Sequence, residues 1–274
     1  MLKFSTLGSG SDGNAFVVSS GDEAIIIDLG FSRKELKKRL SQLQIAPERL
    51  IGALLTHDHC DHSNGCRIFC DELNLPLYTT CGTAHYLRER KKLPAKVMEF
   101  ESGGAFSIGG FEIKSFPVPH DAAEPVGFTI CADGFKIGIA TDLGYVTSPV
   151  RYNLRDCDLL VLESNYDPDM LRNSDRDLRL KRRIAGRLGH LNNEGAANVL
   201  EELLTVRTKS LLLAHMSREC NAPELIKECC AAKLCELGFS GIHFDVLQQE
   251  VPSGTIELYE DGIRIVDFES GDTL

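Results

Sequence analysis

The stretch Thr56-His57-Asp58-His59-Cys60-Asp61-His62 places three histidines and two aspartates within six consecutive residues. It directly follows the apolar run 51–55, which has the composition of a buried strand. Neutral imidazoles and carboxylates are good ligands for zinc and related divalent ions. Alternation in an extended turn points His57 and His59 the same way, and a short helical turn then brings Asp61 and His62 to a neighbouring position. The spacing therefore predicts a site for two metal ions, with a solvated polar loop as the alternative.

Three further polar residues follow hydrophobic runs elsewhere in the chain. His120 comes after the run 111–117, Asp142 after 136–141, and His215 after 211–214. Residues of functional sites commonly lie where the strands of a layered fold end. Each of the three has an ordinary alternative, a surface histidine or a turn-forming aspartate. Together with the first motif they favour a metal site.

Composition excludes several classes of protein. The 274 residues are 43% hydrophobic and 26% charged, which is ordinary globular composition rather than disorder or a fibre. Acidic residues outnumber basic ones by 40 to 30, so a globally basic nucleic-acid coat is excluded. No apolar stretch is long enough to span a membrane, and the N-terminus lacks a signal peptide. Ten cysteines without an export signal indicate reduced thiols in the cytoplasm.

Short β-type runs and amphipathic helical patterns alternate along the whole chain, with no linker between them. We interpret residues 1–274 as one domain, a layered α/β or α+β fold in which mixed sheets carry helices on their outer faces. The pattern predicts strands at 2–7, 15–19, 23–28, 50–55, 96–100, 111–117, 126–131, 135–140, 159–163, 210–215, 242–247, 255–259 and 263–268, and helices at 32–43, 63–73, 82–91, 174–188, 194–205 and 221–237.

A local concentration of positive charge stands out against the net charge of −10. Between residues 170 and 187 the sequence has six arginines and one lysine but only two aspartates. On the predicted helix 174–188, begun by a capping box of Ser174 and Asp177, the arginines form one stripe that could contact a nucleic-acid backbone. The alternative is a solvated helix face. The stripe consists of Arg172, Arg176, Arg179, Arg183 and Arg187.

Two other features lie near these motifs. His190 directly follows the arginine stripe, and we hypothesise that it contacts the scissile phosphate or protonates the leaving oxygen, because histidine exchanges protons near neutral pH. A structural role at the entry of the next helix is its alternative. The glycine-rich run 8–14 lacks the ending of a P-loop, so we interpret it as a tight turn beside the metal site, where Asp12 or Asn14 could touch substrate.

The motif His57-x-His59-x-Asp61-His62, followed by His120, Asp142 and His215, resembles that of the metallo-β-lactamase fold superfamily. The resemblance implies an αββα sandwich of two mixed sheets with the metals at one edge. It assigns His57, His59 and His120 to the first metal and Asp61, His62 and His215 to the second, with Asp142 between them. Asp28 matches an aspartate that orients the ligands.

Further segments, among them 8–14, 140–145, 163–167 and 189–193, resemble the YycJ/WalJ group of nucleases. This resemblance implies a 5′-to-3′ exonuclease that acts on DNA rather than RNA with two divalent ions. The ligand types suit zinc or manganese, and we interpret Asp61 and His190 as catalytic residues. Two alternatives stay open at this point. One is a small-molecule metallohydrolase, such as a cyclic phosphodiesterase or a glyoxalase II-like thioesterase, and the other is a non-catalytic metal-binding regulator.

Overall fold

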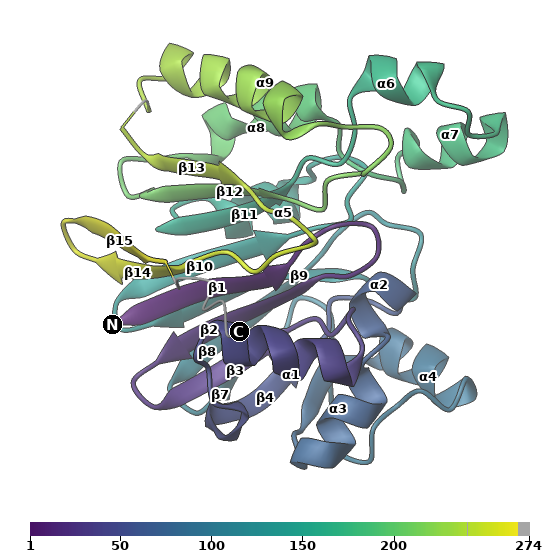
Figure 1. Cartoon of the computed structure of the whole chain (residues 1–274), viewed down its shortest axis with the longest axis vertical. Coiled ribbons are helices and arrows are strands. Elements are labelled where there is room, and N and C mark those ends of the chain that lie inside the picture. Colours follow the sequence, from purple (N-terminus) through teal and green to yellow (C-terminus); the bar gives the residue numbers. More distant parts are fainter. Residues whose placement is uncertain (240, 268–274) are drawn as a thin grey trace, which may run out of the picture.

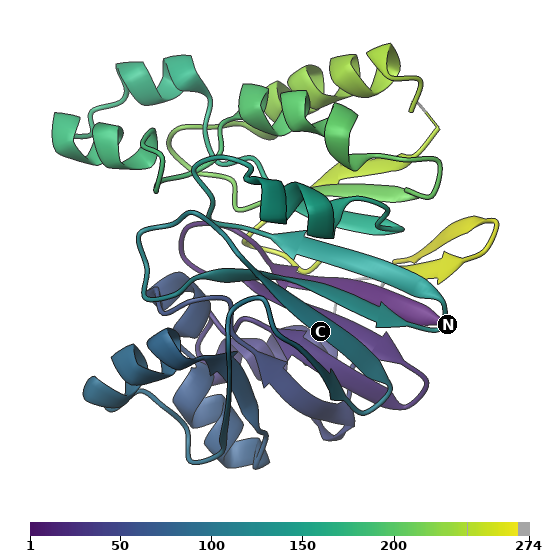
Figure 2. The same ribbon diagram turned by 180° about the vertical axis from the view of Figure 1, so that it is seen from behind.

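The computed structural model describes residues 1–239 and 241–267. Two mixed β-sheets lie face to face, and helices cover the outer face of each (Figure 1, Figure 2). The predicted αββα sandwich is therefore confirmed. Within the described residues, no helix combines the length and the apolar character that crossing a membrane requires.

The first sheet has the strand order β15-β14-β1-β2-β3-β4-β5-β6. Its strands β3 to β6 run parallel, and the others pair antiparallel. Helices α1, α3 and α4 pack on its outer face (Figure 1). Its elements are β1 (Leu2–Gly8), β2 (Ala15–Ser20), β3 (Glu23–Ile27), α1 (Arg33–Gln42), the short 3-10 helix η1 (Pro47–Arg49), β4 (Leu50–Leu54), α2 (Cys60–Ser63), α3 (Cys66–Leu73), β5 (Leu77–Thr80), α4 (Cys81–Glu89), β6 (Val97–Phe100), β14 (Thr255–Tyr259) and β15 (Gly262–Val266).

The second sheet has the strand order β13-β12-β11-β10-β9-β8-β7. Strands β10 to β13 run parallel, and β7 to β10 pair antiparallel. Helices α5, α8 and α9 lie on its outer face. Its elements are β7 (Ala105–Ile108), β8 (Phe111–Pro117), β9 (Val126–Ala132), β10 (Phe135–Ala140), α5 (Ser148–Leu154), β11 (Leu159–Glu163), α6 (Pro168–Asn173), α7 (Leu178–Ile184), α8 (Asn193–Leu203), β12 (Ser210–Ala214), α9 (Pro223–Glu236) and β13 (His243–Val246).

The inner strands are apolar throughout because both of their faces are buried. In β3, Ile25 and Ile27 pack in the core between the sheets, whereas Ile26 packs against the outer helices. In β12, Leu212 faces the inner core and Leu213 the outer one. Alternate side chains of a strand point to opposite faces, so a strand covered on both sides needs a continuous apolar run.

This topology brings the ends of several strands to one edge of the sandwich. Strands β3 and β4 of the first sheet and β10, β11 and β12 of the second all end there at their carboxyl ends. The polar residues that follow these strands therefore gather at that edge, as ligands do in open sheets whose strands run parallel.

The predicted helix 63–73 corresponds to α3, which begins three residues later, and α2 is a separate short helical turn before it. Between them the backbone N–H of Gly65 donates to the carbonyl of Leu29 at 2.7 Å, and a Cβ on Gly65 would lie 2.3 Å from the carbonyl oxygen of Phe31. This close approach of two backbone segments requires glycine and interrupts the helix.

The single helix predicted at 174–188 is wrong. The segment contains only α7, and α6 precedes it, so the five arginines do not form one helical stripe. Asp177 rather than Ser174 caps α7, because its carboxylate accepts from Leu180 N at 2.9 Å. The chain then turns back tightly at Gly189, where a Cβ would lie 2.2 Å from two carbonyl oxygens of α7.

Several short elements were not predicted, namely β5, β7, α5 and α6. Each has four to seven residues, too few for the hydrophobic periodicity to be distinctive. The predicted last strand, 263–268, corresponds to β15, and its final residue Phe268 lies outside the described residues.

Candidate metal centre

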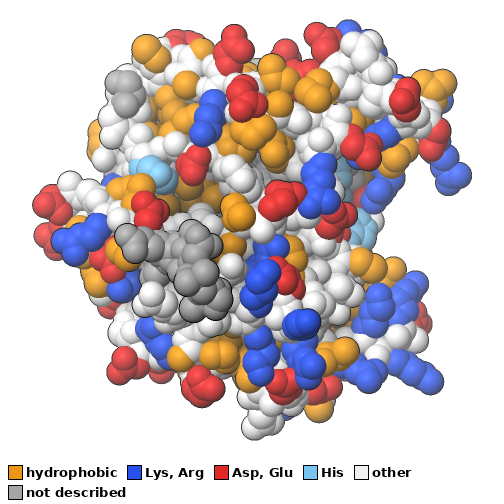
Figure 3. Space-filling model, viewed as in Figure 1, with side chains coloured by type: hydrophobic (Ala, Val, Ile, Leu, Met, Phe, Trp, Pro, Cys, Tyr) orange, Lys and Arg blue, Asp and Glu red, His pale blue; other side chains and the backbone are white. Residues whose placement is uncertain are grey.

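The structure brings all seven predicted ligands together at the sheet edge, in two adjoining clusters. In each cluster, nitrogen or oxygen atoms suited to metal binding lie within 4.8 Å of one another. In Figure 3, histidine side chains reach the surface at the right-hand edge, in a hollow between α6–α7 above and α2–α4 below. The first cluster is His57, His59 and His120, and the second is Asp61, His62, Asp142 and His215.

In the first cluster, neighbouring oxygens engage the Nδ1 atoms of two histidines. His57 Nδ1 lies 3.0 Å from Thr56 Oγ1, and His120 Nδ1 lies 3.0 Å from the carbonyl of Gly189. The Nε2 atoms are thereby directed at the cluster, and His59 Nδ1 lies 3.2 Å from His120 Nε2. Buried His57 Nε2 has no hydrogen-bond partner among the described residues. A buried nitrogen without a partner is costly, and a metal ion at this position would satisfy it.

In the second cluster, a carboxylate holds the outer nitrogen of His62, because Nδ1 lies 2.7 Å from Asp28 Oδ2. The inner nitrogen of His215, Nε2, lies 3.1 Å from Asp61 Oδ2 within the cluster. Asp142 reaches both clusters, because its Oδ2 lies 3.0 Å from His62 Nε2 and its Oδ1 lies 3.6 Å from Nε2 of His120 in the first cluster. Asp142 is thus placed to contact two ions at once.

Asp28 lies behind the ligands, in the position that the sequence predicts. Its buried carboxylate accepts from the backbone N–H of Thr56 at 2.9 Å and from the Thr56 hydroxyl at 3.0 Å, besides its contact with His62. A carboxylate in this position fixes the ring orientation and tautomer of a ligating histidine.

Three of these residues adopt left-handed backbone conformations directly after a strand. The φ angles of Asp28, Asp142 and His215 are 60°, 57° and 58°. This region is uncommon for residues other than glycine, although aspartate and histidine enter it more readily than most. Such strain concentrates at functional sites, where the surrounding packing holds it.

The buried charges strongly shift the protonation of the imidazoles. Burial, reinforced by the neighbouring His62, holds the pKa of His57 well below its ordinary value. Burial opposes a positive charge on His215 as well, but Asp142 and its other carboxylate neighbours raise that pKa to about 10. Metal ligands must be neutral imidazoles, so a cation held by His215 would displace its proton.

Glu163, at the end of β11, is a site residue that the sequence analysis did not single out. Its buried carboxylate accepts from the backbone N–H groups of Leu143 and Leu191 through Oε2. Its Oε1 lies 3.0 Å from His215 Nδ1 and 2.8 Å from His190 Nδ1. The available signal was its position, since an acid that ends an apolar strand resembles Asp28 and Asp142 in this respect.

His190 lies between the two clusters. Its ring centroid is 5.2 Å from that of His120 in the first cluster and 5.2 Å from that of His215 in the second. Because Glu163 engages Nδ1, the other ring nitrogen, Nε2, is the one available to a substrate. His190 also lines the cavity beside the clusters.

The glycine-rich run 8–14 also packs against the clusters. Asn14 Nδ2 lies 3.1 Å from His62 Nε2, and Ser9 Oγ accepts from the backbone N–H of His215 at 2.9 Å. Asp12 instead pairs with Arg218, at 2.5 Å. The run forms a turn beside the site, and its polar side chains support the histidines.

Comparison with known proteins agrees with this geometry. Residues 23–216 match the model of a family described as the beta-lactamase superfamily domain. The chain belongs to the beta-lactamase superfamily. It is 33% identical over 241 residues to exodeoxyribonuclease YycJ of Bacillus anthracis, covering 87% of this chain and 91% of that protein. It is 31% identical to exodeoxyribonuclease WalJ of Streptococcus pneumoniae, covering 93% of this chain and 96% of that one. The predicted membership of the YycJ/WalJ group is therefore confirmed.

Known structures share the fold of this beta-lactamase superfamily chain at lower identity. The metallo-beta-lactamase fold protein YhfI of Bacillus subtilis has a TM-score of 0.69 at 19% identity, covering 92% of this chain and 98% of its own. Zn(2+)-bound PqqB of Methylobacterium extorquens has a TM-score of 0.68 at 17% identity, covering 93% and 100%. Together with the curated relatives, this superfamily membership shows that the protein is a metal-dependent hydrolase rather than a non-catalytic regulator.

Only two of the five stripe arginines line the cavity of about 300 Å³ beside the clusters of this hydrolase. They are Arg183 in α7, which forms a two-pronged pair with Asp121, and Arg176, which pairs with Glu219. Arg172 pairs with Asp169 on α6 and does not line the cavity. Arg179 and Arg187 do not line it either.

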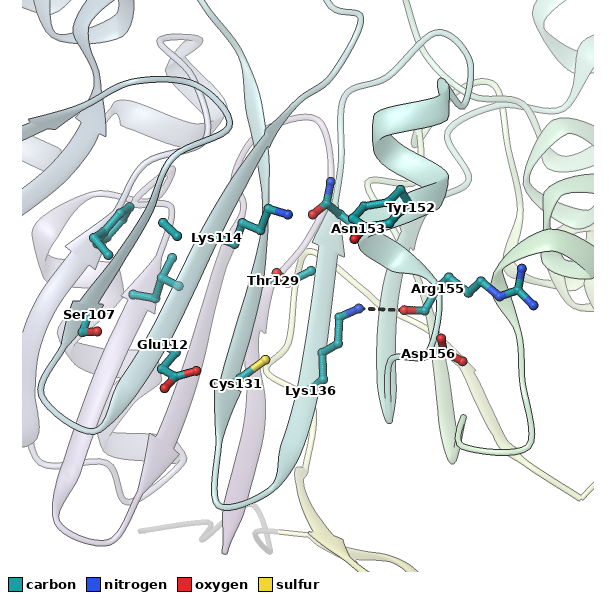
Figure 4. Close-up of a pocket in the computed structure, with 13 residues that line it drawn as sticks. Ser107, Glu112, Lys114, Thr129, Cys131, Lys136, Tyr152, Asn153, Arg155 and Asp156 are labelled. Carbon is teal, nitrogen blue, oxygen red and sulfur yellow. Dashed lines mark hydrogen bonds between the residues drawn. The ribbon is translucent and has the colours of Figure 1, made fainter.

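A larger cavity of about 670 Å³ lies elsewhere, on the outer face of the second sheet (Figure 4). Strands β7 to β10 and helix α5 enclose it, and its lining contains none of the clustered histidines. Its lining includes side chains of both charges, among them Lys114, Lys136 and Glu112. The hydrolase site is therefore the smaller cavity, because only that one contains the metal-ligating groups.

Replacing Glu163 by Gln is expected to lower metal affinity or activity by roughly 10- to 100-fold. The carboxylate of Glu163 meets four donors, two backbone N–H groups and the imidazoles of His190 and His215. A glutamine side chain has only one acceptor oxygen, and its amide nitrogen is itself a donor. The two imidazoles therefore lose their fixed orientation. Metal titration followed by dye competition measures the change. Glu257→Gln, a buried glutamate in β14, serves as the control, and equal metal affinities in the two variants would contradict the assignment.

Proposed function

We propose that the chain is a 5′-to-3′ DNA exonuclease that works with two divalent metal ions. The observation that carries this proposal is the joining of two histidine-rich clusters through Asp142. The names of the curated relatives, both exodeoxyribonucleases, support DNA as the substrate in preference to RNA.

The donor set fits two zinc or manganese ions. Imidazole nitrogens and carboxylate oxygens suit either metal, and the partnerless His57 Nε2 supports an ion at the first cluster. Ions held there activate water and neutralise the charge that develops on the phosphate. In this proposal His57, His59 and His120 hold the first ion, Asp61, His62 and His215 hold the second, and Asp142 contacts both.

The residues around the clusters then have distinct tasks. Water forms a bond to phosphorus and releases a proton to solvent while the bond from phosphorus to the leaving oxygen breaks, and the protonated His190 gives that oxygen a proton from Nε2. Glu163 holds His190 and His215 in orientation. Asp61 fixes the second ion beside the reacting phosphate, and Arg176 and Arg183 contact phosphates of the strand.

Two broader proposals accompany this one. We propose that residues 1–274 act as one domain, which is supported by the single core shared between the two sheets. We also propose that the enzyme works in the cytoplasm. This is supported by the ten cysteines, all of which lie among the described residues and are free, as expected in a reducing compartment.

Degradation of end-labelled DNA tests the proposal. Metal-stripped protein is reloaded with zinc or manganese and given DNA or RNA strands labelled at the 5′ or the 3′ end. We expect labelled mononucleotides to appear early from 5′-labelled DNA, and no activity from the Asp61→Ala variant. Activity that survives this substitution, or early release from the 3′ label, would contradict the proposed site or polarity respectively.

Removing the two cavity arginines is expected to weaken the salt dependence of binding. For single-stranded DNA, each phosphate contact that is removed reduces the magnitude of the slope of log K against log salt concentration by about 0.7. The double variant Arg176→Gln with Arg183→Gln is therefore expected to reduce this magnitude by about 1.4. Fluorescence anisotropy with labelled DNA across a salt series measures it. Arg33→Gln, an exposed arginine of α1 that pairs with Glu72, is the control. An unchanged slope would favour the small-molecule hydrolase.

A further inference from the structure

An exposed tyrosine lies three residues after Asp142, the aspartate that reaches both clusters. Tyr145 is 38% exposed, and the guanidinium carbon of Arg187 lies over its ring, 4.6 Å from the centroid. Arg187 is itself exposed and makes no ion pair among the described residues, unlike Arg176 and Arg183. Its charge is therefore available to a ligand.

Backbone contacts fasten this pair to the rim of the metal site. Leu143 N donates to Glu163 at 2.9 Å, and Gly144 N donates to the carbonyl of Pro119 at 3.0 Å, next to His120. From the other side, Asp121 N donates to the carbonyl of Leu188 at 3.1 Å. The loops that carry Tyr145 and Arg187 thus also carry Asp142 and His190, and both are hydrogen-bonded to the loop that carries His120.

The two loops also meet directly. A Cβ on Gly144 would lie 2.4 Å from the carbonyl oxygen of Arg187, so glycine allows the backbones to approach closely enough for the stacking. An aromatic ring backed by a guanidinium is a surface on which an unpaired nucleic-acid base stacks, and the guanidinium can contact the adjacent phosphate.

We propose that Tyr145 and Arg187 form a stacking platform for an unpaired base next to the scissile phosphate. This inference rests on the proposed nuclease function and names the residues that would position the end of the strand. In duplex DNA each base is paired and stacked on its neighbours, so its face becomes available to Tyr145 only after the end has opened.

A second tyrosine provides a matched control. Tyr152 of α5 is 76% exposed and also has a cation near its ring, Lys114 Nζ at 5.2 Å from the centroid. It lines the larger cavity on the outer face of the second sheet, with Lys114 in the same lining (Figure 4). Tyr152 is therefore, like Tyr145, an exposed tyrosine with a cationic neighbour, but it lines the larger cavity, which contains none of the clustered histidines.

The test compares Tyr145→Ala, Tyr145→Phe and Tyr152→Ala on a single-stranded oligonucleotide and on a fully abasic strand of the same length. Bis-p-nitrophenyl phosphate, a small diester, reports the basal hydrolysis of the wild type. We expect Tyr145→Ala to raise KM for the oligonucleotide roughly 5- to 150-fold, the range for loss of one base–aromatic stack. On the abasic strand Tyr145→Ala should equal the wild type, because that strand has no base to stack. Tyr145→Phe and Tyr152→Ala should both resemble the wild type on both strands.

Oligonucleotides with one abasic position, moved step by step from the labelled end, complete the test. If Tyr145 stacks on a base, one abasic position should raise KM for the wild type and leave Tyr145→Ala unaffected, a non-additivity that a merely structural role would not produce. Additive effects at every position, or an unchanged KM in Tyr145→Ala, would overturn the platform. A wild type that hydrolyses the small diester but no oligonucleotide would instead overturn the nuclease function, and the platform with it.

Discussion

The Asp142→Asn variant is expected to lose about a thousandfold or more of the wild-type kcat and at least one of the two metal ions proposed for the site. Asp142 Oδ2 lies 3.0 Å from His62 Nε2 and its Oδ1 lies 3.6 Å from His120 Nε2, so the amide removes a charge from both clusters at once. A metal ion contributes several kcal/mol of transition-state stabilisation, and each 1.36 kcal/mol is tenfold in rate, from which the size of the effect follows.

Asparagine is the suitable replacement because it keeps the shape of the side chain and tolerates the φ of 57° at this position. Metal content by mass spectrometry and steady-state turnover measure the two effects. The control is Asp58→Asn in the motif 56–62, because the carboxylate of Asp58 accepts from Ala123 N at 3.1 Å and an amide oxygen can replace it there. If Asp142→Asn kept both ions and turned over like Asp58→Asn, the two clusters would not act together.

The His190→Ala variant is expected to lower kcat on DNA by roughly 10²- to 10⁴-fold, the usual contribution of a general acid or base. Its metal content should stay at the wild-type level, because the proposed ligands, three in the first cluster and four in the second, do not include His190, whose Nδ1 contacts Glu163. The ring lies between His120 and His215, so an oxygen that leaves from a phosphate at the clusters is within reach of its Nε2.

The leaving group distinguishes proton donation from a positioning role. A p-nitrophenolate leaves without a proton, so a thymidine ester of p-nitrophenyl phosphate should be hydrolysed by His190→Ala nearly as fast as by the wild type. Equal losses on DNA and on this ester would show that His190 binds or orients substrate and donates no proton. Normal turnover on both would remove His190 from the mechanism.

The local patterns were sufficient to predict most of the fold. Strands such as β3 and β12 can be predicted from their long apolar runs, because both faces of a strand in the middle of a sandwich are buried. Short elements such as β5 were not predicted, because four residues are too few to show a distinctive hydrophobic periodicity. The helix predicted at 174–188 failed because Asp177 caps a later start and Gly189 reverses the chain, and both effects depend on where the neighbouring loops lie.

The candidate ligands were also predictable, for a chemical reason. Burying histidines and acids is energetically costly unless they pair with one another or bind a common ligand. Here several lie in one short motif, and others directly follow apolar strands. The structure brings these seven side chains together, and their roles as metal ligands stay a proposal until metal is measured. Glu163 carried the same signal as Asp142, an acid at a strand end, but a single acid in one sequence does not reveal which histidines it will meet.

The sequence by itself determined which residue types could bind a cation and that strands would deliver them to the ends of sheets. Periodicity and ligand chemistry are local properties, so they can be recognised without knowing any contact. Only the tertiary structure decided that Glu163 holds two histidines, that Arg176 and Arg183 alone of the stripe line the site cavity, and that Arg187 lies on Tyr145. These pairings join residues from separate elements, and the packing of the two sheets and their loops sets the distances between them.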